Sequence, residues 1–319
     1  MCLSNRHLNL ILLSTEACNL RCTYCFEKFA RGRMEPRIVQ GVKCLLDRRR
    51  QDLEILNLSW FGGEPLLAMD VVREISTHAM ALFGGREGVH FSSNMTTNAM
   101  LLSRTRFEEL LGLGVKAFYI TFDGPRESHD AKRMLPNGQG AFDTIWDNVL
   151  ALREVEGDFE IVLRLHVDAE NQESMAPFIE TCKATFGQDP RFNLCVQMIK
   201  RLGGAQDQLL PVLERNEASS IIARLRCLAN PDQVASSKPE LSICYASWAN
   251  SFIIRADGSI NKCSVAVDHP NNSVGRLEAD GRMKLDSTMI AKWMRGIFSG
   301  KPEELECPML GLADTRKSG

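Results

Sequence analysis

The feature that most constrains this chain of 319 residues is a group of three cysteines, Cys18, Cys22 and Cys25, that follows the apolar run Leu8–Leu13. Three neighbouring thiols cannot all be paired as disulfides, and thiolates at a C-x3-C-x2-C spacing are the soft ligands that an iron-sulfur centre needs. A structural zinc or an electron-transfer cluster normally takes four protein ligands. Three ligands therefore predict a centre with one metal position open to a substrate or cofactor, with a zinc knuckle or a surface cysteine cluster as the alternative.

The run resembles the cluster-binding loop of radical S-adenosylmethionine (SAM) enzymes, C-x3-C-x-aromatic-C, with Tyr24 at the aromatic position. The resemblance implies a 4Fe-4S cluster on Cys18, Cys22 and Cys25, with the amino and carboxylate groups of SAM on the fourth iron. It implies that Tyr24 lies near the adenine. It also implies reductive cleavage of SAM to a 5'-deoxyadenosyl radical that abstracts a hydrogen atom, with an electron donor such as flavodoxin or ferredoxin as a partner.

A second motif, Gly62-Gly63-Glu64-Pro65, follows the strand predicted over Ile55–Phe61. Two glycines allow close backbone approach, and a carboxylate can accept hydrogen bonds from an ammonium group. Alone, the motif is typical of a turn. One βα unit after the cysteines, it resembles the GGEP motif of the same enzymes, which implies that these four residues hold the SAM amino group.

Further strand ends resemble elements of the sulfatase-maturing group of these enzymes: T-T-N at 96–98, T-F-D-G at 121–124, H-D-A-K-R at 129–133 and G-Q-G-A-F at 138–142. Thr121 stands where the group has Ser but keeps the hydroxyl, which implies a place near the SAM ribose. Arg133 is expected to contact the SAM carboxylate or a substrate. The cofactor contacts implied in this part of the chain are Thr97, Asn98, Thr121, Asp123, Arg133 and Arg164.

Arg164 and His166 are two apart on a predicted strand and therefore share one face. For His166 the pattern favours a hydrogen-bonded structural role. For Arg164 a structural role and a SAM contact remain open. Asn171, shortly after them, is expected to cap the next helix or to reach the site.

Apolar β-like runs alternate with amphipathic helical patterns, which favours parallel βαβ units. The predicted strands are Leu8–Leu13, Ile55–Phe61, Val89–Ser93, Ala117–Phe122, Glu160–Val167 and Phe192–Gln197. The predicted helices are Pro36–Arg49, Met69–Phe83, Ser103–Leu111, Phe142–Val155, Glu173–Phe186 and Glu214–Leu228. Six units are too few for a closed eight-stranded barrel and fit the partial (β/α)6 TIM-like barrel that the resemblance implies, over residues 1–229.

Residues 230–319 are predicted to form a smaller module with a hairpin around Asp257-Gly258. Cys244, Gly258 and Cys263 resemble the opening of the SPASM or twitch domain, which binds auxiliary clusters in this family. A full SPASM domain would have cysteines at positions 304, 313 and 317, which are Glu, Ala and Lys here, and would need one more beyond the end of this sequence. Two complete auxiliary clusters are therefore excluded by counting. Cys244, Cys263 and Cys307 remain to hold one cluster or none.

Composition excludes some classes of function. Lys and Arg (38) balance Asp and Glu (40), so no basic field suggests nucleic-acid binding. Eleven cysteines without a signal peptide indicate a reducing, cytoplasmic compartment. The run Leu8–Leu13 is too short to span a membrane.

The segment from Thr121 to Phe142 looks most like peptide-modifying members, so the expected function is maturation of a ribosomally made peptide, with a crosslink or oxidation favoured over epimerisation. A radical SAM dehydrogenase or cyclase acting on a small molecule is the alternative, and a non-enzymatic electron carrier is a distant one. The first strand begins within about ten residues of Met1, so no separate N-terminal peptide-recognition domain is expected. The peptide is expected at the carboxyl ends of the strands, pairing with an edge of the first strand or of the hairpin Phe252–Cys263.

Overall fold

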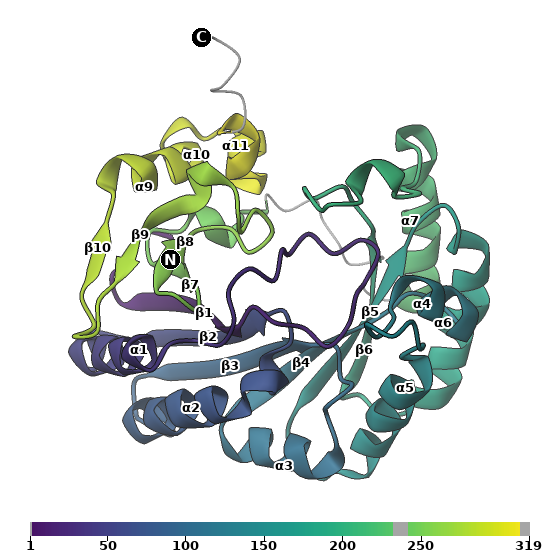
Figure 1. Cartoon of the computed structure of the whole chain (residues 1–319), viewed down its shortest axis with the longest axis horizontal. Coiled ribbons are helices and arrows are strands. Elements are labelled where there is room, and N and C mark those ends of the chain that lie inside the picture. Colours follow the sequence, from purple (N-terminus) through teal and green to yellow (C-terminus); the bar gives the residue numbers. More distant parts are fainter. Residues whose placement is uncertain (1, 232–241, 313–319) are drawn as a thin grey trace. The chain divides into compact units, whose positions relative to one another are not determined.

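The computed structural model describes residues 2–231 and 242–312 (Figure 1). The chain forms two compact units. Unit 1 joins Met1–Ala17, Glu27–Ser93 and Pro239–Gly319, and unit 2 joins Cys18–Phe26 and Asn94–Lys238. The sequence predicts a partial barrel over residues 1–229 and a smaller module over residues 230–319. This division remains a prediction, and residues 232–241, next to the predicted boundary, lie outside the described residues.

The strands of unit 1 are β1 (His7–Thr15), β2 (Ile55–Gly62), β7 (Ser251–Ile254), β8 (Ser259–Asn261), β9 (Ser273–Leu277) and β10 (Met283–Leu285). β1 lies between two parallel neighbours, with Asn9 opposite both Asn57 of β2 and Ser251 of β7. Every residue of β1 is buried, as expected for a strand with partners on both sides. β8, β9 and β10 continue from β7 as antiparallel neighbours.

This pairing corrects one prediction. The first strand and the hairpin were expected to offer a free edge to a peptide, but β1 is paired with β2 and β7, and the hairpin is paired with β1 and β9. The four residues of β7, three of them apolar, pair with β1, which is far away in sequence, so the local pattern could not indicate this pairing. The outermost strand on this side is β10.

The long helices of unit 1 begin and end where the sequence predicts them: α1 at Pro36–Arg49 and α2 at Met69–Phe83. Pro36 opens α1 because its missing amide hydrogen would have no helical partner at that position. A short helical turn, η1 (Pro65–Ala68), precedes α2. Three short helices lie near the end of the described chain: α9 (Ser287–Trp293), α10 (Arg295–Ser299) and α11 (Pro302–Glu306).

Unit 2 contains the parallel strands β4 (Val115–Phe122), β5 (Glu160–Val167) and β6 (Phe192–Met198). β3 (His90–Thr97) is divided between the units at Ser93. The helices of unit 2 are α3 (Arg104–Gly112), α4 (Arg126–Lys132), α5 (Phe142–Ala151), α6 (Gln172–Phe186) and α7 (Arg215–Ala229), and Figure 1 shows α4 to α7 beside β5 and β6.

An aromatic cluster fills the space between β4 and its helices. Phe122 has ring centroids 5.8 Å from Phe142, 5.7 Å from Trp146 and 5.9 Å from Phe178, distances typical of favourable edge-to-face packing. This core explains why the apolar pattern located α5 and α6 well. Helix α4 was missed because its seven residues, R-E-S-H-D-A-K, carry almost no apolar pattern.

All six predicted strand and helix repeats are present, so the (β/α)6 order of the prediction is confirmed. The predicted hairpin at Asp257-Gly258 is also confirmed, with Gly258 in a left-handed conformation at φ 86°. Within the described ranges, none of the helices is both long and apolar enough to cross a membrane.

Candidate functional site

The three predicted cluster ligands lie half-buried on the segment Cys18–Phe26 of unit 2. The amide of Leu20 points at the Sγ of Cys18 at 3.4 Å, and the amide of Cys25 donates to the carbonyl of Cys22 at 3.1 Å. The turn therefore folds back on itself and directs one amide at the sulfur of Cys18. Hydrogen bonds to cysteine sulfur are one of the ways a protein tunes the potential of an iron-sulfur centre.

Backbone hydrogen bonds hold this segment against the residues that end α4. The amide of Arg21 donates to the carbonyl of Met134 at 2.7 Å, and the amide of Thr23 donates to the carbonyl of Lys132 at 2.9 Å. Backbone hydrogen bonds do not depend on side-chain type, so no sequence pattern could predict them. They place the residue after them, Tyr24, beside the end of β4.

Tyr24 takes part in a buried triad with two predicted site residues. Its hydroxyl donates to the Asp123 carboxylate, 2.9 Å from each oxygen, and accepts from Nη2 of Arg133 at 2.6 Å. Nε of Arg133 donates directly to Oδ2 of Asp123 at 3.2 Å. Asp123 has no solvent exposure, so its charge is stable there only because it is paired and hydrogen-bonded. The predicted contacts of Asp123 and Arg133 with SAM remain predictions.

The triad sets the charges around the cysteines. Burial works to raise the pKa of Asp123, but Arg133 and the neighbouring histidines outweigh it and hold that pKa below its ordinary value. Burial raises the pKa of the Cys22 thiol, and the Arg133 guanidinium opposes that shift. Burial also lowers the pKa of His129 to about 4, so its ring is neutral near pH 7. Arg133, with a smaller contribution from Arg21, thus favours a thiolate at Cys22 against the effect of burial.

The T-T-N element makes a tight turn at the end of β3. The Thr97 hydroxyl accepts the amide of Ala99 at 3.1 Å, and Oδ1 of Asn98 accepts the amide of Met100 at 3.0 Å. Ala99 sits at φ 61°, a conformation that is strained for alanine and is held by these side chains. The turn leaves Nδ2 of Asn98 facing Sγ of Cys18 at 3.8 Å. The motif therefore aims a donor at a predicted ligand.

Thr121, Arg164 and His166 lie at the neighbouring ends of β4 and β5, with Thr121 opposite Arg164 in the parallel register. Arg164 donates to the Thr96 hydroxyl at 3.0 Å and lies over the ring of Tyr119 at 4.7 Å. Its proposed contact with SAM is not tested by this arrangement.

His166 is less satisfied than the sequence suggested. Its Nδ1 is buried without a hydrogen-bond partner among the described residues and lies 3.8 Å from Oδ1 of Asp123. Its ring meets that of Tyr24 edge-on at 5.6 Å. Burial lowers the pKa of His166 to about 4, so the ring is neutral near pH 7.

Asn171 was expected to cap the next helix or to reach the site, and its side chain lies against the strand ends at the site. Its side-chain amide donates to the carbonyls of Asp123 at 3.0 Å and His166 at 2.8 Å, while its Oδ1 accepts the amide of Asp168 at 2.9 Å. It makes no side-chain cap on α6 and instead ties the ends of β4 and β5 together. Lys132 was also missed; its ammonium lies 2.7 Å from the buried carboxylate of Asp168.

The glycines of the G-G-E-P motif, in unit 1, are required by close packing against the end of β1. A Cβ on Gly62 would lie 2.2 Å from the carbonyl oxygen of Thr15, and one on Gly63 would lie 2.2 Å from that of Ala17. The amide of Glu64 donates to Ala17 at 2.9 Å. Its fully buried carboxylate accepts the amide of Leu66 at 2.9 Å and so caps η1. The predicted role of the motif in holding SAM is untested.

The stem of the cysteine loop is also in unit 1. Thr15 and Arg33 form an antiparallel bridge, the amide of Glu16 donates to Gly32 at 3.0 Å, and the amide of Met34 donates to Ser14 at 2.8 Å. The chain thus leaves β1 and returns to α1 through a closed two-stranded neck. Cys18, Cys22 and Cys25 all lie in the loop that this neck closes.

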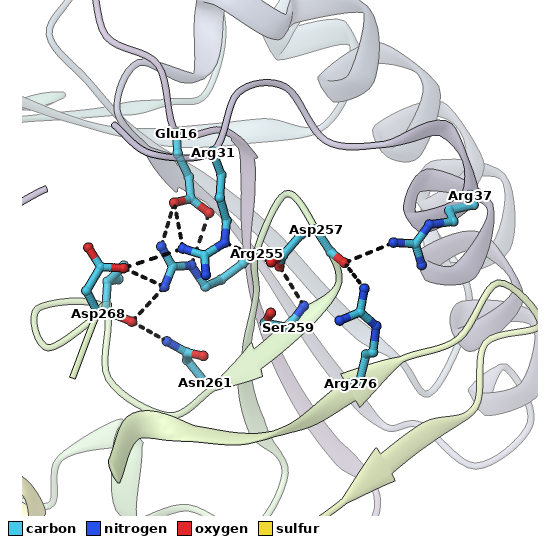
Figure 2. Close-up of polar contacts among 10 residues, drawn as sticks. Glu16, Arg31, Arg37, Arg255, Asp257, Ser259, Asn261, Asp268 and Arg276 are labelled. Atoms are coloured by element: carbon cyan, nitrogen blue, oxygen red, sulfur yellow. Dashed lines mark hydrogen bonds and ion pairs between the residues drawn. The ribbon is translucent and has the colours of Figure 1, made fainter. Parts of the chain in front are cut away.

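An ion network surrounds this neck (Figure 2). Arg255, which follows β7, makes two parallel hydrogen bonds to the Glu16 carboxylate, at 3.0 and 2.5 Å. It also forms an ion pair with Asp268 at 2.8 Å. Arg31 adds an ion pair to Asp257 at 2.8 Å. Burial raises the pKa of nearby Glu27 to about 8, and Glu16 adds to that shift. No local pattern signals this network, because its partners are far apart in sequence.

The cysteines of the C-terminal part of unit 1 come together in space. Burial raises the pKa of Cys244, and the neighbouring Cys263 and Cys307 raise it further. The amide of Cys244 donates to the carbonyl of Leu305 at 2.9 Å, close to Cys307 in sequence, and the amide of Cys263 donates to Asn272 at 2.9 Å. These three predicted ligands of an auxiliary cluster therefore share one neighbourhood, while their binding of a cluster remains a prediction.

Both cysteine groups fit the chemistry of an iron-sulfur cluster. In residues 2–231 and 242–312, no three His, Cys, Asp or Glu side chains surround a point as the ligands of a single metal ion do. A 4Fe-4S cluster binds each cysteine on a separate iron, so its ligands need not converge on one atom. Around Cys18 the donors from Leu20 and Asn98 are the kind that such sulfur atoms accept.

A separate surface depression lies away from both cysteine groups. It has a volume of about 680 Å³ and is lined by residues that precede β1, β2 and β3, including Arg6, Glu54 and Val89. Active sites of α/β folds lie at the carboxyl ends of parallel strands, so this depression is at the wrong end for the site.

With this geometry in place, the relationship of the chain to known proteins is clear. The family model described as "Radical SAM superfamily" matches residues 12–181, which is more than half of the chain and includes every predicted SAM contact. The chain belongs to the radical SAM superfamily. This membership implies a 4Fe-4S cluster and SAM as cofactors.

Among curated proteins, the chain is similar to two described as PqqA peptide cyclase. The one from Bradyrhizobium diazoefficiens is 28% identical over 120 residues, 38% of this chain and 30% of that protein. The one from Rhodopseudomonas palustris is 31% identical over 119 residues, 37% of this chain and 29% of that protein. The matched segments span less than a third of each relative.

Two solved structures share the fold. Native anSMEcpe with bound AdoMet and Cp18Cys peptide is 18% identical, with a TM-score of 0.67, covering 89% of this chain and 79% of that one. Streptococcus suis SuiB bound to precursor peptide SuiA is 12% identical, with a TM-score of 0.63, covering 92% of this chain and 67% of that one. The likeness covers nearly the whole chain, which confirms the radical SAM fold predicted from the sequence.

Proposed function

We propose that this protein is a radical SAM enzyme that abstracts a hydrogen atom from a side chain of a ribosomally made peptide and so matures it. The observation that carries the proposal is the sequence similarity to two peptide cyclases within the family match. Likeness in fold to proteins described with bound peptides supports it. An oxidation or crosslink is favoured over epimerisation, and an electron donor of the flavodoxin or ferredoxin type is required. The proposed compartment is the cytoplasm.

When bound, the 4Fe-4S cluster supplies the electron that cleaves SAM to methionine and a 5'-deoxyadenosyl radical. Cys18, Cys22 and Cys25 would hold it. Leu20 and Asn98 direct N–H groups at Cys18, and Arg133 favours the thiolate of Cys22.

The buried triad fixes the aromatic ring beside these ligands. Because its hydroxyl is held by both Asp123 and Arg133, the Tyr24 ring cannot swing away from this position without breaking charge-assisted hydrogen bonds. A ring fixed in this way is suited to position the adenine of SAM. Thr97, Thr121 and Arg164, at the ends of β3, β4 and β5, are the proposed contacts for the rest of the cofactor.

In the C-terminal part of unit 1, Cys244, Cys263 and Cys307 are proposed to hold at most one auxiliary cluster. Such a cluster could accept the electron that a net oxidation of the substrate releases. Redox-neutral epimerisation would not need that acceptor, which is why oxidation or crosslinking is favoured.

The proposal is tested by anaerobic incubation with SAM, reductant and two probes, the PqqA peptide and the Cp18Cys peptide, with mass spectrometry of 5'-deoxyadenosine and of the peptides. The expected result is 5'-deoxyadenosine without substrate, increased by a peptide whose mass changes, for example by the loss of two hydrogen atoms. A matched arm replaces the peptides by polyols and nucleotides. Turnover in that arm alone would overturn the peptide assignment in favour of a small-molecule enzyme, and no 5'-deoxyadenosine in any arm would overturn the radical chemistry.

A further inference from the structure

We propose that Arg255 is a positioning residue that couples the two cysteine groups, holding the neck of the loop that carries Cys18 and the loop that follows Cys263 with one guanidinium. The inference rests on the proposed function only in that Cys18, Cys22 and Cys25 hold the radical cluster. Figure 2 shows Arg255 between Glu16 and Asp268, with partners on both sides.

The contact with the neck is a bidentate, desolvated ion pair. Nε and Nη2 of Arg255 donate to the two carboxylate oxygens of Glu16 at 3.0 and 2.5 Å. Both side chains are only 4% exposed. A parallel fork of this kind fixes the angle between the groups as well as their distance, and removing one partner leaves a buried charge unpaired.

Glu16 is well placed to transmit that constraint. It belongs to the neck itself, where its amide donates to the Gly32 carbonyl at 3.0 Å, and it precedes Cys18 by two residues. Two residues of backbone leave few conformations between a fixed carboxylate and the first predicted ligand. The position of Cys18 therefore depends on how firmly Glu16 is held.

The other face of the guanidinium holds the loop after Cys263. Nη1 of Arg255 donates to the carbonyl of Val267 and to Oδ1 of Asp268, both at 2.8 Å. Asn261, just before Cys263, donates to the same Val267 carbonyl at 2.7 Å. Arg255 and Asn261 thus close this loop from one side.

Neighbouring arginines do not duplicate this role. Arg31 lies 3.8 Å from Glu16 and 3.5 Å from Asp268, beyond good hydrogen-bond distance for the first, and its side chain is one-third exposed. Arg276, on β9, is exposed and donates to the Asp257 carbonyl at 3.0 Å. Arg276 therefore provides a matched control.

The experiment compares Arg255→Met, Arg255→Lys and Arg276→Met with the unaltered protein after anaerobic reconstitution. The measurements are iron per chain, the electron paramagnetic resonance spectrum of the reduced protein with and without SAM, and the thermal midpoint by circular dichroism. We expect the Arg255→Met variant to hold no more than half as much iron per chain as the unaltered protein. We also expect a different change in its spectrum when SAM is added. Arg255→Lys should recover part of both, because an ammonium can still pair with Glu16, and Arg276→Met should resemble the unaltered protein.

Two further variants keep the proposal falsifiable if Arg255→Met does not fold. Glu16→Gln should perturb the spectrum in the same direction, and Asp268→Asn should do so more weakly, since that carboxylate is 22% exposed. Unaltered iron and spectra in a folded Arg255→Met variant, or in both of these variants, would overturn the inference while leaving the proposed function intact. Absence of a SAM-responsive cluster in the unaltered protein would instead overturn the proposed function.

Discussion

The two cysteine groups are built in opposite ways. Cys18, Cys22 and Cys25 are neighbours in sequence and are surrounded by charge, with the Asp123–Arg133 pair buried beside them. Cys244, Cys263 and Cys307 are distant in sequence and are brought together by backbone and amide hydrogen bonds such as those of Leu305 and Asn272. The first group is defined by its spacing and needs the fold for its electrostatics. The second exists only because of the fold.

The largest expected effect separates the groups by chemistry. Replacing Cys18, Cys22 and Cys25 together by Ala should abolish reductive SAM cleavage and remove about four irons per chain, the content of one 4Fe-4S cluster. 5'-Deoxyadenosine production is measured by chromatography and iron by a colorimetric assay. Undiminished production would contradict the assignment of the radical cluster.

The same replacement at Cys244, Cys263 and Cys307 should have a different outcome. If these residues hold a cluster, iron falls from about eight to about four per chain, while SAM cleavage without substrate persists. Unchanged iron would show that the second group is empty. Reproducible content near twelve in the unaltered protein would be incompatible with at most one auxiliary cluster.

Neutralising the buried charge should destabilise unit 2. Asp123→Asn leaves the Arg133 guanidinium without its ion pair, and breaking a buried pair in this way typically costs about 3–5 kcal/mol of unfolding free energy. Asp143→Asn, which removes an exposed ion pair with Arg126, should cost less than about 1 kcal/mol. Urea unfolding measures the free energy of unfolding of both variants. Equal decreases would show that the buried ion pair contributes no more to stability than the exposed one.

The dependence on charge also predicts different responses to acid. His129 has a pKa of about 4 in the fold and 6.5 when unfolded, so the unfolded chain binds the proton more readily. The free energy of unfolding therefore keeps its full value above pH 6.5 and decreases as the pH falls from 6.5 towards 4. The decrease due to His129 is about 3 kcal/mol at most. Hydrogen exchange followed by segment should show unit 2 losing protection first, and His129→Gln should reduce the loss. Equal loss of hydrogen-exchange protection in the segment around Asn272, in unit 1, and the segment around Asp123, in unit 2, would contradict this prediction.

The smallest effect concerns the backbone beside the first group. Gly63→Ala would place a methyl group against the carbonyl of Ala17, directly before Cys18, and overpacking of this kind costs about 1–3 kcal/mol. Gly32→Ala, in the neck of the same loop, meets open space and should be nearly neutral. Thermal unfolding and iron retention distinguish the two, and equal behaviour would show that the close approach at Gly63 is easily relieved.

Sequence reasoning located the elements whose information is local. Pro36 and the apolar pattern after it located α1. The helix predicted from Ser103 was found as α3, which Ser103 caps with its hydroxyl accepting the amide of Arg106 at 3.4 Å. The cysteine spacing and the G-G-E-P turn likewise lie within short stretches.

The rest could not be read because it depends on long-range pairing. Nothing in Phe252-Ile253-Ile254 indicates that β1 is their partner, and Glu16 and Arg255 are 239 residues apart. Asp123 and Arg133 were recognised as site residues, but their pairing through Tyr24 required the fold. The sequence therefore identifies the reactive groups well and the supports between them poorly.

The pairing of β7 with β1 also determines when the cysteine loop can be completed in the cell. Glu16 emerges from the ribosome long before Arg255, and at ordinary rates of synthesis of about 5–20 residues per second the delay is roughly ten to fifty seconds. During that time β1 lacks its pairing with β7, and Glu16 in the neck lacks its ion pair with Arg255. The loop that carries Cys18, Cys22 and Cys25 is therefore held less firmly. We therefore expect stable cluster insertion to follow synthesis of Arg255 and its pairing with Glu16, so that oxygen exposure before that step damages this protein more than the same exposure after folding.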